Sequence, residues 1–430
     1  MKKYYLDIDL EELSNIGSLD IKEIHKIKFK KYLTELYLRI DSHNIGKLSR
    51  NLMYQCFTSN YYKKLHSNPN SVEYNLFNTL TTRVHLGSNL TKTISQYKLN
   101  IDLDTYLDNN NTLLVPYEVK KSTKKNIINY ITIDKNHLIK TIEELSINPS
   151  KEQKREILQY RILLASLNKD TNKLTLEYDI KPAGRLYNQY SHLKKEIRNN
   201  LLHGYIEYDI STASYQFLYD FAAQIKKDLE APLIQEYLSN KKAIRYKLAK
   251  ELDTSYEVIK EILTAMGFGA KDKESYFEYY DDEILEVIKE PLNAIEKILY
   301  ENNIPQEKWN NSIEIQKFIL EIKTLKNLVA NYIKENYYNP KTKTLNINNK
   351  KKVFEKQFRS SQALSFLYQH YESNFLLSMV KTYKKYTKNK DYFMLHDALI
   401  VKKDIDIKIL EASKQTLDFK INWKLEREVI

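Results

Sequence analysis

The chain contains very little cysteine and glycine, with one Cys and seven Gly among 430 residues. The single Cys56 excludes a disulfide framework and any zinc site built on several thiolates, and it fits a reducing compartment. Long hydrophobic runs are also absent, because no stretch approaches the roughly 18 uncharged apolar residues of a transmembrane helix. The N-terminus, MKKYYLDIDLEEL, turns acidic at once and has no apolar signal region. We therefore expect a cytoplasmic protein that has no membrane partner.

The composition is that of a globular protein with an excess of positive charge. Hydrophobic residues make up 42% and charged residues 29%, which excludes a disordered or fibrous chain. There are 68 Lys and Arg against 56 Asp and Glu, a formal net charge of +12. The length indicates two or three domains, and the positive balance favours a polyanionic partner such as a nucleic acid. The abundance of Lys, Asn, Ile and Tyr is compatible with an AT-rich genome, such as that of a phage or plasmid.

The few glycines are unevenly distributed. Four of the seven, Gly184, Gly204, Gly267 and Gly269, fall between residues 184 and 269. A chain that uses so little glycine is expected to keep it where the backbone turns sharply or approaches another group closely. These positions therefore point to the functional part of the chain.

Hydrophobic periodicity divides the chain near residue 180. Residues 1–180 are expected to be mostly helical, broken by polar loops, and they hold no motif that indicates a chemical function. Beyond them a short strand is expected at Tyr205–Ile210, followed by helices to about residue 337 and a basic loop over 339–359. Another helix over 360–383 then leads to an apolar hairpin, YFMLHDALIV.

Two aspartates stand at the ends of these strands inside otherwise apolar sequence. Asp209 lies in EYDIS, and Asp397 lies at the tip of the hairpin between His396 and Ala398. Each alone is more simply a turn former or a helix N-cap. As a pair from separate strands they suit a two-metal site, since Mg²⁺ takes oxygen ligands and uses one or two protein carboxylates besides water and substrate phosphates.

A helix between the aspartates carries a candidate nucleotide-binding face. In DTSYEVIKEILTAMGFGAK, the residues Lys260, Thr264 and Phe268 recur every four positions and so share one face of a helix. The ammonium suits phosphates, the ring suits a base or sugar, and Gly267 and Gly269 let the backbone approach a ligand. The alternative is an amphipathic helix that ends in a glycine C-cap.

A basic segment, PAGRLYNQYSHLKKEIRNNLLHG, precedes Asp209. Its cations are interleaved with Tyr187, Asn188 and Tyr190, a pattern that suits phosphate and sugar contacts on a nucleic acid. A solvated helix face would have the same composition, but the position directly before the first carboxylate favours nucleic-acid binding. The cations are Arg185, Lys194, Lys195 and Arg198.

The order of these motifs resembles that of a known polymerase family. GRLY, EYDISTASYQFL, a lysine helix that ends in GFG, and LHDA are similar to the palm and fingers motifs of family A DNA polymerases and of the related phage-type single-subunit RNA polymerases. The similarity covers residues 181–405, a little over half of the chain. Each motif is short, but the four occur in the right order, with 24 residues from Arg185 to Asp209, 51 from there to Lys260 and 137 to Asp397.

The resemblance implies roles for individual residues. Asp209 and Asp397 look like the metal-binding carboxylates, with the carbonyl of Ile210 as a further metal ligand. Lys260 looks like the lysine that grips the triphosphate. The residues expected at the incoming nucleotide, besides Lys260, are Ser214, Tyr256, Thr264, Phe268 and Gly269. The residues expected on the nucleic acid are Arg185, Lys194, Lys195, Arg198, Gln369 and His396.

Departures from the family pattern bear on the choice of sugar. Ala398 follows the second aspartate, where the DNA enzymes usually carry Glu and the RNA enzymes a small residue. Ser214 replaces the Glu that blocks a ribose 2′-OH, so ribonucleotides are expected to fit. Phe268 lacks the hydroxyl with which the RNA enzymes prefer ribose, so sugar choice is expected to be loose.

A further departure removes a cation. Tyr256 stands where the family has an arginine one turn before Lys260. The site that binds the triphosphate therefore has one positive charge fewer than in the family, unless Arg245 or Lys250 substitutes. We expect this to lower catalytic efficiency without changing the class of enzyme.

These observations predict an α/β (α+β), mostly helical right-hand polymerase with palm, fingers and thumb and a small antiparallel palm sheet. The helical N-terminal region would serve as thumb or template-binding domain. The expected domains are this region, a first palm part, the fingers and a second palm part, over residues 1–180, 181–230, 231–358 and 359–430.

The predicted activity is template-directed nucleotidyl transfer by a monomer with two Mg²⁺ ions, or Mn²⁺. The substrates are NTPs or dNTPs, on a DNA template with a primer or nascent strand. The residues favour DNA-directed RNA synthesis or ribonucleotide-tolerant, primase-like synthesis, with a family A-like DNA polymerase as the alternative. A catalytically inactive nucleic-acid-binding protein on the same scaffold and a two-metal nuclease are the alternatives from other classes.

Overall fold

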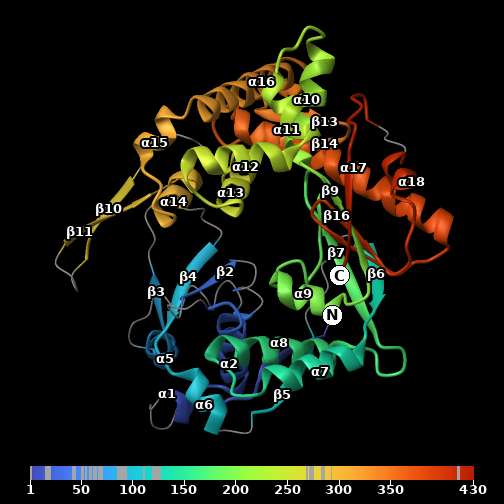
Figure 1. Cartoon of the computed structure of the whole chain (residues 1–430). Helices are drawn as coiled ribbons and strands as arrows, with labels where there is room; N and C mark the ends of the chain where they lie inside the picture. Colours follow the sequence, from blue (N-terminus) through green and yellow to red (C-terminus); the bar gives the residue numbers. More distant parts are fainter. Residues whose placement is uncertain are drawn as a thin grey trace. The chain divides into compact units, whose positions relative to one another are not determined.

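The computed structural model describes residues 2–14, 21–40, 45–49, 53, 56–57, 61, 65, 71–84, 94–109, 112–118, 127–267, 270, 276–281, 286–291, 293–413 and 417–430. The chain forms two compact units (Figure 1). Unit 1 comprises Met1–Lys125, Thr132–Thr175 and Leu193–His203, and unit 2 comprises Asn126–Ile131, Leu176–His192 and Gly204–Ile430.

Unit 1 mixes helices with small antiparallel sheets, β1-β5 and β2-β4-β3. Its core forms around α2, which buries Phe29, Tyr32 and Leu33 against the strands and the neighbouring helices. Ser150 and Gln153 form a capping box that begins α8. The elements are β1 (Lys2–Leu6), α1 (Leu10–Ser14), α2 (Glu23–Tyr37), β2 (Ile45–Ser49), α5 (Val72–Leu80), β3 (Thr81–Val84), β4 (Ile94–Leu99), α6 (Leu103–Asn109), β5 (Leu114–Glu118), α7 (Lys135–Leu145), α8 (Lys151–Ser166) and α9 (Lys195–Leu201).

Unit 2 contains a four-stranded antiparallel sheet in the order β15-β16-β9-β17. The central strands β9 and β16 run side by side in Figure 1. Strands β15 and β16 consist of residues that are buried along their whole length. The strands are β9 (Ile206–Ile210), β15 (Tyr392–Leu395), β16 (Ala398–Val401) and β17 (Leu425–Val429). A further sheet, β6-β7-β8, combines β6 (Ile127–Thr132), β7 (Lys173–Ile180) and β8 (Leu186–Tyr187).

Helices of unit 2 pack around α10, which contacts α11, α16 and α17. Helix α10 buries Phe217, Leu218 and Phe221, the apolar stripe that the sequence predicts there. The helices are α10 (Ala213–Ile225), α11 (Pro232–Ser239), α12 (Lys241–Leu252), α13 (Tyr256–Gly267), α14 (Ala294–Glu301), α15 (Gln306–Asn311), α16 (Ile313–Tyr337), α17 (Ser360–Thr387) and α18 (Ile407–Glu411).

The prediction of a mostly helical α+β fold with small antiparallel sheets is confirmed, but three local predictions are wrong. Residues 1–180 hold strands β1 to β7 as well as helices, because strands such as β2 are too short to show a clear period of two. The helices before residue 337 are interrupted by a hairpin of β10 (Tyr276–Asp281) and β11 (Glu286–Pro291). The basic loop forms the sheet β12-β13-β14, from Tyr338–Asn339, Thr344–Ile347 and Lys350–Val353.

Within the described ranges, no helix has the length and apolar character needed to cross a membrane.

The division of unit 2 into palm and fingers, and of the whole chain into four domains, stays a prediction.

Candidate active site

The two aspartates come from neighbouring strands of the four-stranded sheet. Asp209 lies on β9 directly opposite Ala398, the residue that follows Asp397. Asp397 lies in the tight turn between β15 and β16, and its carbonyl accepts a hydrogen bond of 3.1 Å from the backbone N–H of Ile210. The predicted hairpin is therefore confirmed, and its tip is fixed to the end of the predicted strand. Both aspartates are half-buried.

Electrostatics show that the two carboxylates interact. Burial raises the pKa of Asp209 to about 8, and the negative charge of Asp397 adds to the increase. Burial also raises the pKa of Asp397, while its own backbone N–H and Arg185 oppose the increase. Glu207 and Glu426 raise the pKa of Asp209 further. The local excess of negative charge favours a bound cation at this end of the sheet.

Strained backbone lies on both sides of the pair. Thr212, three residues after Asp209, and His396, directly before Asp397, each have a φ of 48°. A left-handed conformation is uncommon for residues other than glycine and rarer still for a β-branched threonine. Such strain costs about 1–3 kcal/mol and persists where the surrounding structure enforces it, often at functional sites. The ring of His396 packs edge-on against Tyr187, with centroids 5.3 Å apart.

On one side of the pair, Arg185 forms a bidentate ion pair with Glu372 of α17. The Arg185 Nε and Nη2 donate to the two carboxylate oxygens at 2.8 Å each. The Arg185 side chain is 13% exposed and that of Glu372 is fully buried. Arg185 lowers the pKa of Asp397 and Asp397 raises that of Glu372, so the three charges form one network. The sequence predicted Arg185 at this site and missed Glu372.

Gly184 explains how Arg185 reaches α17. Its φ is 104°, and an added Cβ would lie 2.9 Å from Ser373 Oγ, so the turn between β7 and β8 fits against α17 only without a side chain. The backbone N–H of Gly184 donates to the carbonyl of Lys181 at 2.8 Å, which closes the turn. The prediction that Gly184 marks a sharp turn and a close approach is confirmed.

The sequence contained a pattern that could have identified Glu372. It is the single Asp, Glu, Lys or Arg between Ser360 and Val380 of an otherwise apolar and polar uncharged helix. A lone charge in such a helix is costly to bury without a partner, and therefore predicts one.

On the other side of the pair, Glu426 of β17 lies directly opposite Asp209. Residues that face each other across an antiparallel pair share one face of the sheet, so both carboxylates point to the same side. Glu426 Oε1 accepts a hydrogen bond of 2.6 Å from Ser211 Oγ and forms a very short ion pair with Lys241 Nζ at the start of α12. Lys241 in turn lowers the pKa of Asp209. The contacts of Glu426 with Ser211 and Lys241 were not predicted, because the three segments are far apart in sequence.

The two cations proposed to substitute for the arginine missing at Tyr256 differ in exposure. Arg245 is buried, and its guanidinium donates to the hydroxyls of Tyr237, at 2.7 and 3.2 Å, and of Tyr256, at 3.2 Å. Arg245 is therefore a buried hydrogen-bond partner of Tyr256. Lys250 is exposed, one residue past the buried positions Leu248 and Ala249.

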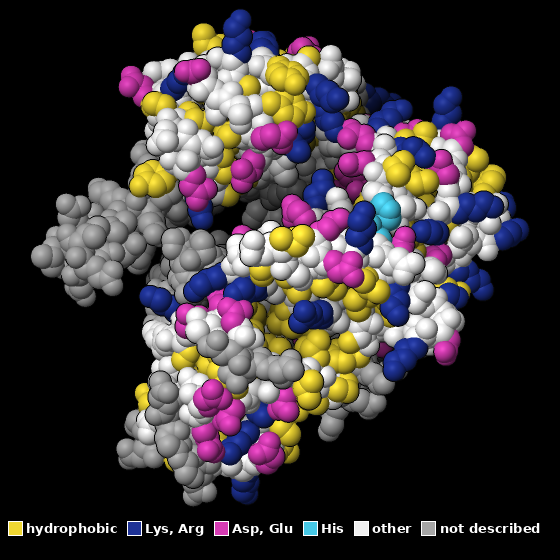
Figure 2. Space-filling view, turned by 60° about the horizontal axis from the view of Figure 1, so that its bottom comes forward, with side chains coloured by type: hydrophobic (Ala, Val, Ile, Leu, Met, Phe, Trp, Pro, Cys, Tyr) yellow, Lys and Arg dark blue, Asp and Glu magenta, His cyan; other side chains and the backbone are white. Residues whose placement is uncertain are grey.

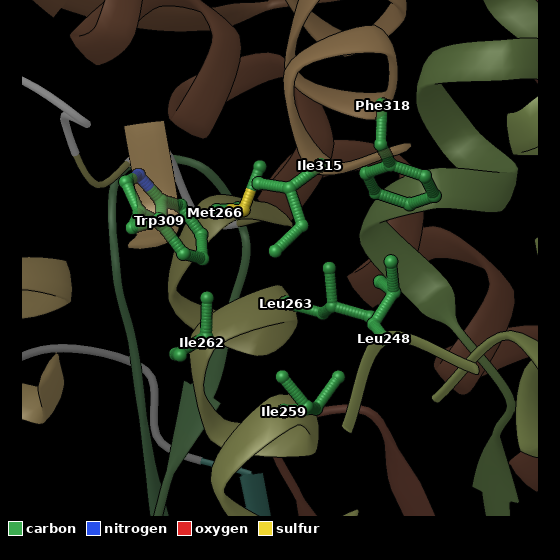
Figure 3. Close-up of a pocket in the computed structure, with 8 residues that line it drawn as sticks. All are labelled: Leu248, Ile259, Ile262, Leu263, Met266, Trp309, Ile315 and Phe318. Carbon is green, nitrogen blue, oxygen red and sulfur yellow. The ribbon is translucent and has the colours of Figure 1, made fainter. Parts of the chain in front are cut away.

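Helix α13 is anchored by its apolar face, which leaves Lys260 on the opposite face. Figure 3 shows that this face meets side chains of α12, α15 and α16 around a small apolar pocket. Lys260 is 52% exposed and donates to Glu257 Oε2 at 3.2 Å, its one ion pair within the described residues. Lys260 and Thr264 line an open groove between α13 and α14, so their predicted common face is confirmed. The apolar lining consists of Leu248, Ile259, Ile262, Leu263, Met266, Trp309, Ile315 and Phe318.

The end of α13 meets the first turn of α10 at Ser214, five residues after Asp209. A Cβ on Gly267 would lie 2.3 Å from Ser214 Oγ and 2.9 Å from the ring of Tyr215. The Tyr215 hydroxyl donates to the carbonyl of Leu263 at 2.6 Å, which fixes the two helices to each other. Ser214 therefore lies against the helix that carries Lys260, and its place at the nucleotide stays a prediction.

The remaining predicted residues are dispersed. Lys194, Lys195 and Arg198 belong to unit 1, where Lys194 pairs with Glu152 and Glu156. Gln369 lies on α17, and its side chain donates to Ser365 Oγ at 3.2 Å. Phe268 and Gly269 lie outside the described residues. On the face seen in Figure 2, Lys and Arg side chains are interspersed with Asp and Glu and do not form one continuous patch.

The donor set at the aspartates suits a hard cation. Among the described residues, no three or more His, Cys, Asp or Glu side chains are grouped as the ligands of one metal ion. Mg²⁺ does not require such a group, since it keeps several waters and binds one or two carboxylates plus substrate phosphates. Burial raises the pKa of both aspartates, and the charge of Asp397 raises that of Asp209 further, so a divalent cation that stabilises both carboxylates suits the pair.

No protein-family model and no curated protein matches the sequence. Among solved structures, the chain is similar to the POL domain of Pol1 from M. smegmatis in complex with DNA primer-template and dNTP. The TM-score is 0.43 and the sequence identity is 10%, over 65% of this chain and 51% of that chain. The chain thus spans about half the length of the chain that it matches.

Proposed function

We propose that the chain is a template-directed nucleotidyltransferase that binds two Mg²⁺ ions at Asp209 and Asp397. The observation that supports this most is the placement of the two aspartates on adjacent strands, with interacting charges, at the end of the sheet. Lys241 and Arg185 add positive charge on either side of them. The proposed substrates are nucleoside triphosphates and a DNA primer-template or nascent strand, with the enzyme acting as a monomer.

Each residue has a role in the proposed reaction, an in-line attack of a 3′-OH on the α-phosphate with loss of pyrophosphate. The bound Mg²⁺ ions would lower the pKa of the attacking hydroxyl and neutralise the leaving oxygens. Asp209, Asp397 and the carbonyl of Ile210 would hold the ions. Lys260 would neutralise charge on the triphosphate, once it leaves Glu257. Arg185, fixed by its carboxylate partner, would present its remaining donors to the primer-template.

Primer extension tests the proposal. The full chain is incubated with Mg²⁺, all four nucleotides and each of four combinations of DNA or RNA template and primer. We expect metal-dependent extension on at least one combination, and its loss to background in Asp397→Asn with binding of the nucleic acid largely unchanged. Binding without synthesis on every combination would favour an inactive nucleic-acid-binding protein. Degradation of the nucleic acid in place of extension would favour a two-metal nuclease.

The second question is whether the enzyme uses ribonucleotides or deoxyribonucleotides. The proposal on this point rests on Ser214. Its small side chain lies against Gly267 and offers no bulky group to a ribose 2′-OH. We therefore propose RNA synthesis or ribonucleotide-tolerant, primase-like synthesis, with DNA synthesis as the alternative. Strict use of dNTPs would contradict this preference. In a mixed enzyme Ser214→Glu is expected to shift incorporation towards dNTPs, and an unchanged ratio would mean that Ser214 does not face the sugar.

A further inference from the structure

The ion pair between Lys241 and Glu426 connects the first turn of α12 to the last strand of the sheet, beside Asp209. Lys241 Nζ also lies 3.2 Å from Ser211 Oγ, and the same hydroxyl donates to Glu426 at 2.6 Å. Glu426 lies directly opposite Asp209 across the pairing of β9 and β17, and Ser211 follows Asp209 by two residues, so both partners of Lys241 lie beside the aspartate. A cation from the helical region is therefore held at the candidate active site by a carboxylate.

The ion pair between Lys241 and Glu426 is one in which the lysine can exchange its partner for another anion. The side chain of Lys241 is 21% exposed and that of Glu426 is 52% exposed. Ion pairs with such access to water contribute little net stability, because both partners are well solvated when apart. A polyphosphate carries several negative oxygens and can replace a single carboxylate as the partner of a lysine.

Of the other two cations near the site, one is committed to protein partners and the other already has a place at the proposed triphosphate. Arg245 follows Lys241 by one helical turn but is buried and bonded to two tyrosine hydroxyls. Lys260 faces the groove towards α14 and pairs with Glu257. Lys241 contacts Ser211 and Glu426, which lie beside Asp209.

We infer that Lys241 binds the phosphates of the incoming nucleotide, and that Glu426 holds its ammonium in place until the nucleotide displaces the carboxylate. Lys241 then supplies the positive charge that the triphosphate site lacks because Tyr256 stands where the resembled family has an arginine. Ser211 stays with Glu426 as its hydrogen-bond donor when the lysine leaves. The inference rests on the proposed function, because it assigns a nucleotide to the aspartate site.

Calorimetric titration of the full chain with ATP and with inorganic pyrophosphate, each with Mg²⁺ and without template, tests the inference. Lys241→Met is expected to weaken binding of both ligands by about tenfold or more, since a charge-assisted contact is lost. Glu426→Gln is expected to tighten binding by about two- to fivefold, because no ion pair has to be broken first. Binding of adenosine, which has no phosphate, should be the same in all proteins. Lys241→Arg should retain most of the affinity.

Lys241→Met is expected to weaken phosphate binding and Glu426→Gln to strengthen it. These opposite changes in affinity distinguish a lysine that binds phosphate from an ion pair that only holds α12 to β17. Lys247→Met is the matched control, because Lys247 lies on the same helix and pairs with Glu314 at 2.9 Å away from the aspartates. The affinity of Lys247→Met for ATP and for pyrophosphate should equal that of the natural chain. Equal weakening by Lys241→Met and Glu426→Gln, or no change in Lys241→Met, would overturn the inference. In either case the proposed function stands if Asp397→Asn abolishes extension, and falls if the natural chain extends no primer.

Discussion

Two ion pairs flank the aspartates, and they differ in their hydrogen-bond geometry and in how far the carboxylate is exposed. Arg185 and Glu372 are bidentate and shielded from water, with exposed side-chain fractions of 13% and 0%. Lys241 and Glu426 are joined through one oxygen and are 21% and 52% exposed. The first pair connects a strand turn to the long helix α17, and the second connects α12 to the edge strand β17.

The difference indicates a division of labour. Breaking a buried pair leaves an uncompensated charge in a region of low dielectric, so that pair is fixed. Breaking the exposed pair returns both charges to water at little cost, so that pair can exchange partners. One side of the site is thus suited to hold a constant geometry, and the other to respond to an anionic ligand.

The largest expected effect is the loss of the buried pair. Glu372→Ala should lower the free energy of unfolding by about 3–5 kcal/mol, because Arg185 is left without its counter-charge. Urea denaturation measures this loss. Glu426→Ala is the matched control and should cost about 1 kcal/mol or less. Similar losses for both variants would remove the distinction between the two pairs.

A second variant disturbs the geometry that supports the buried pair. Gly184→Ala should cost about 1–3 kcal/mol, since its φ is 104° and the new Cβ would lie 2.9 Å from Ser373 Oγ. Gly204→Ala is the control, with a φ of 73° but its nearest atom, Lys402 Nζ, 3.6 Å away. Adding Ser373→Ala to Gly184→Ala should restore part of the stability. No recovery in this double variant would show that backbone strain alone sets the cost.

The aspartates between the two pairs make stability depend on pH. The pKa of Asp209 in the folded chain is raised from 3.8 to about 8. The folded state therefore holds this proton more tightly than the unfolded chain, so the contribution to stability is full below pH 3.8 and is lost as the pH rises through about 8. Unfolding measured with a chelator across this range should show a smaller loss in Asp209→Asn, and Mg²⁺ should stabilise the natural chain at the alkaline end. A steeper loss in the variant would contradict the direction of the shift.

The smallest expected effect is the coupling within the exposed pair. A double-mutant cycle of Lys241→Met and Glu426→Gln should give a coupling of about 0.2–1 kcal/mol in the free energy of unfolding. The coupling should decrease at high ionic strength, because exposed charges are screened. A coupling of several kcal/mol that does not respond to salt would show that this pair is as fixed as the other.

The strand, helix and hairpin around the aspartates could be predicted, because each depends on local patterns. The apolar run before Asp397 and the stripe of Phe217, Leu218 and Phe221 give a clear period, and the structure confirms both elements. The N-terminal strands and the sheet within the basic loop over 339–359 were missed, since short strands with mixed side chains have no distinct pattern. Lys194 was grouped with Arg185 on proximity in sequence, yet it belongs to the other compact unit.

The sequence by itself determined where the two candidate carboxylates and the lysine helix occur, because the strand that holds Asp209, the turn that holds Asp397 and the face of Lys260 all follow from neighbours in sequence. Only the tertiary structure decided which charges surround the aspartates. Glu372, Glu426 and Lys241 come from three distant elements, and their pairing depends on sheet register and helix packing. Desolvation and charge interaction depend on everything packed around a group, so they cannot be read from the residues beside it.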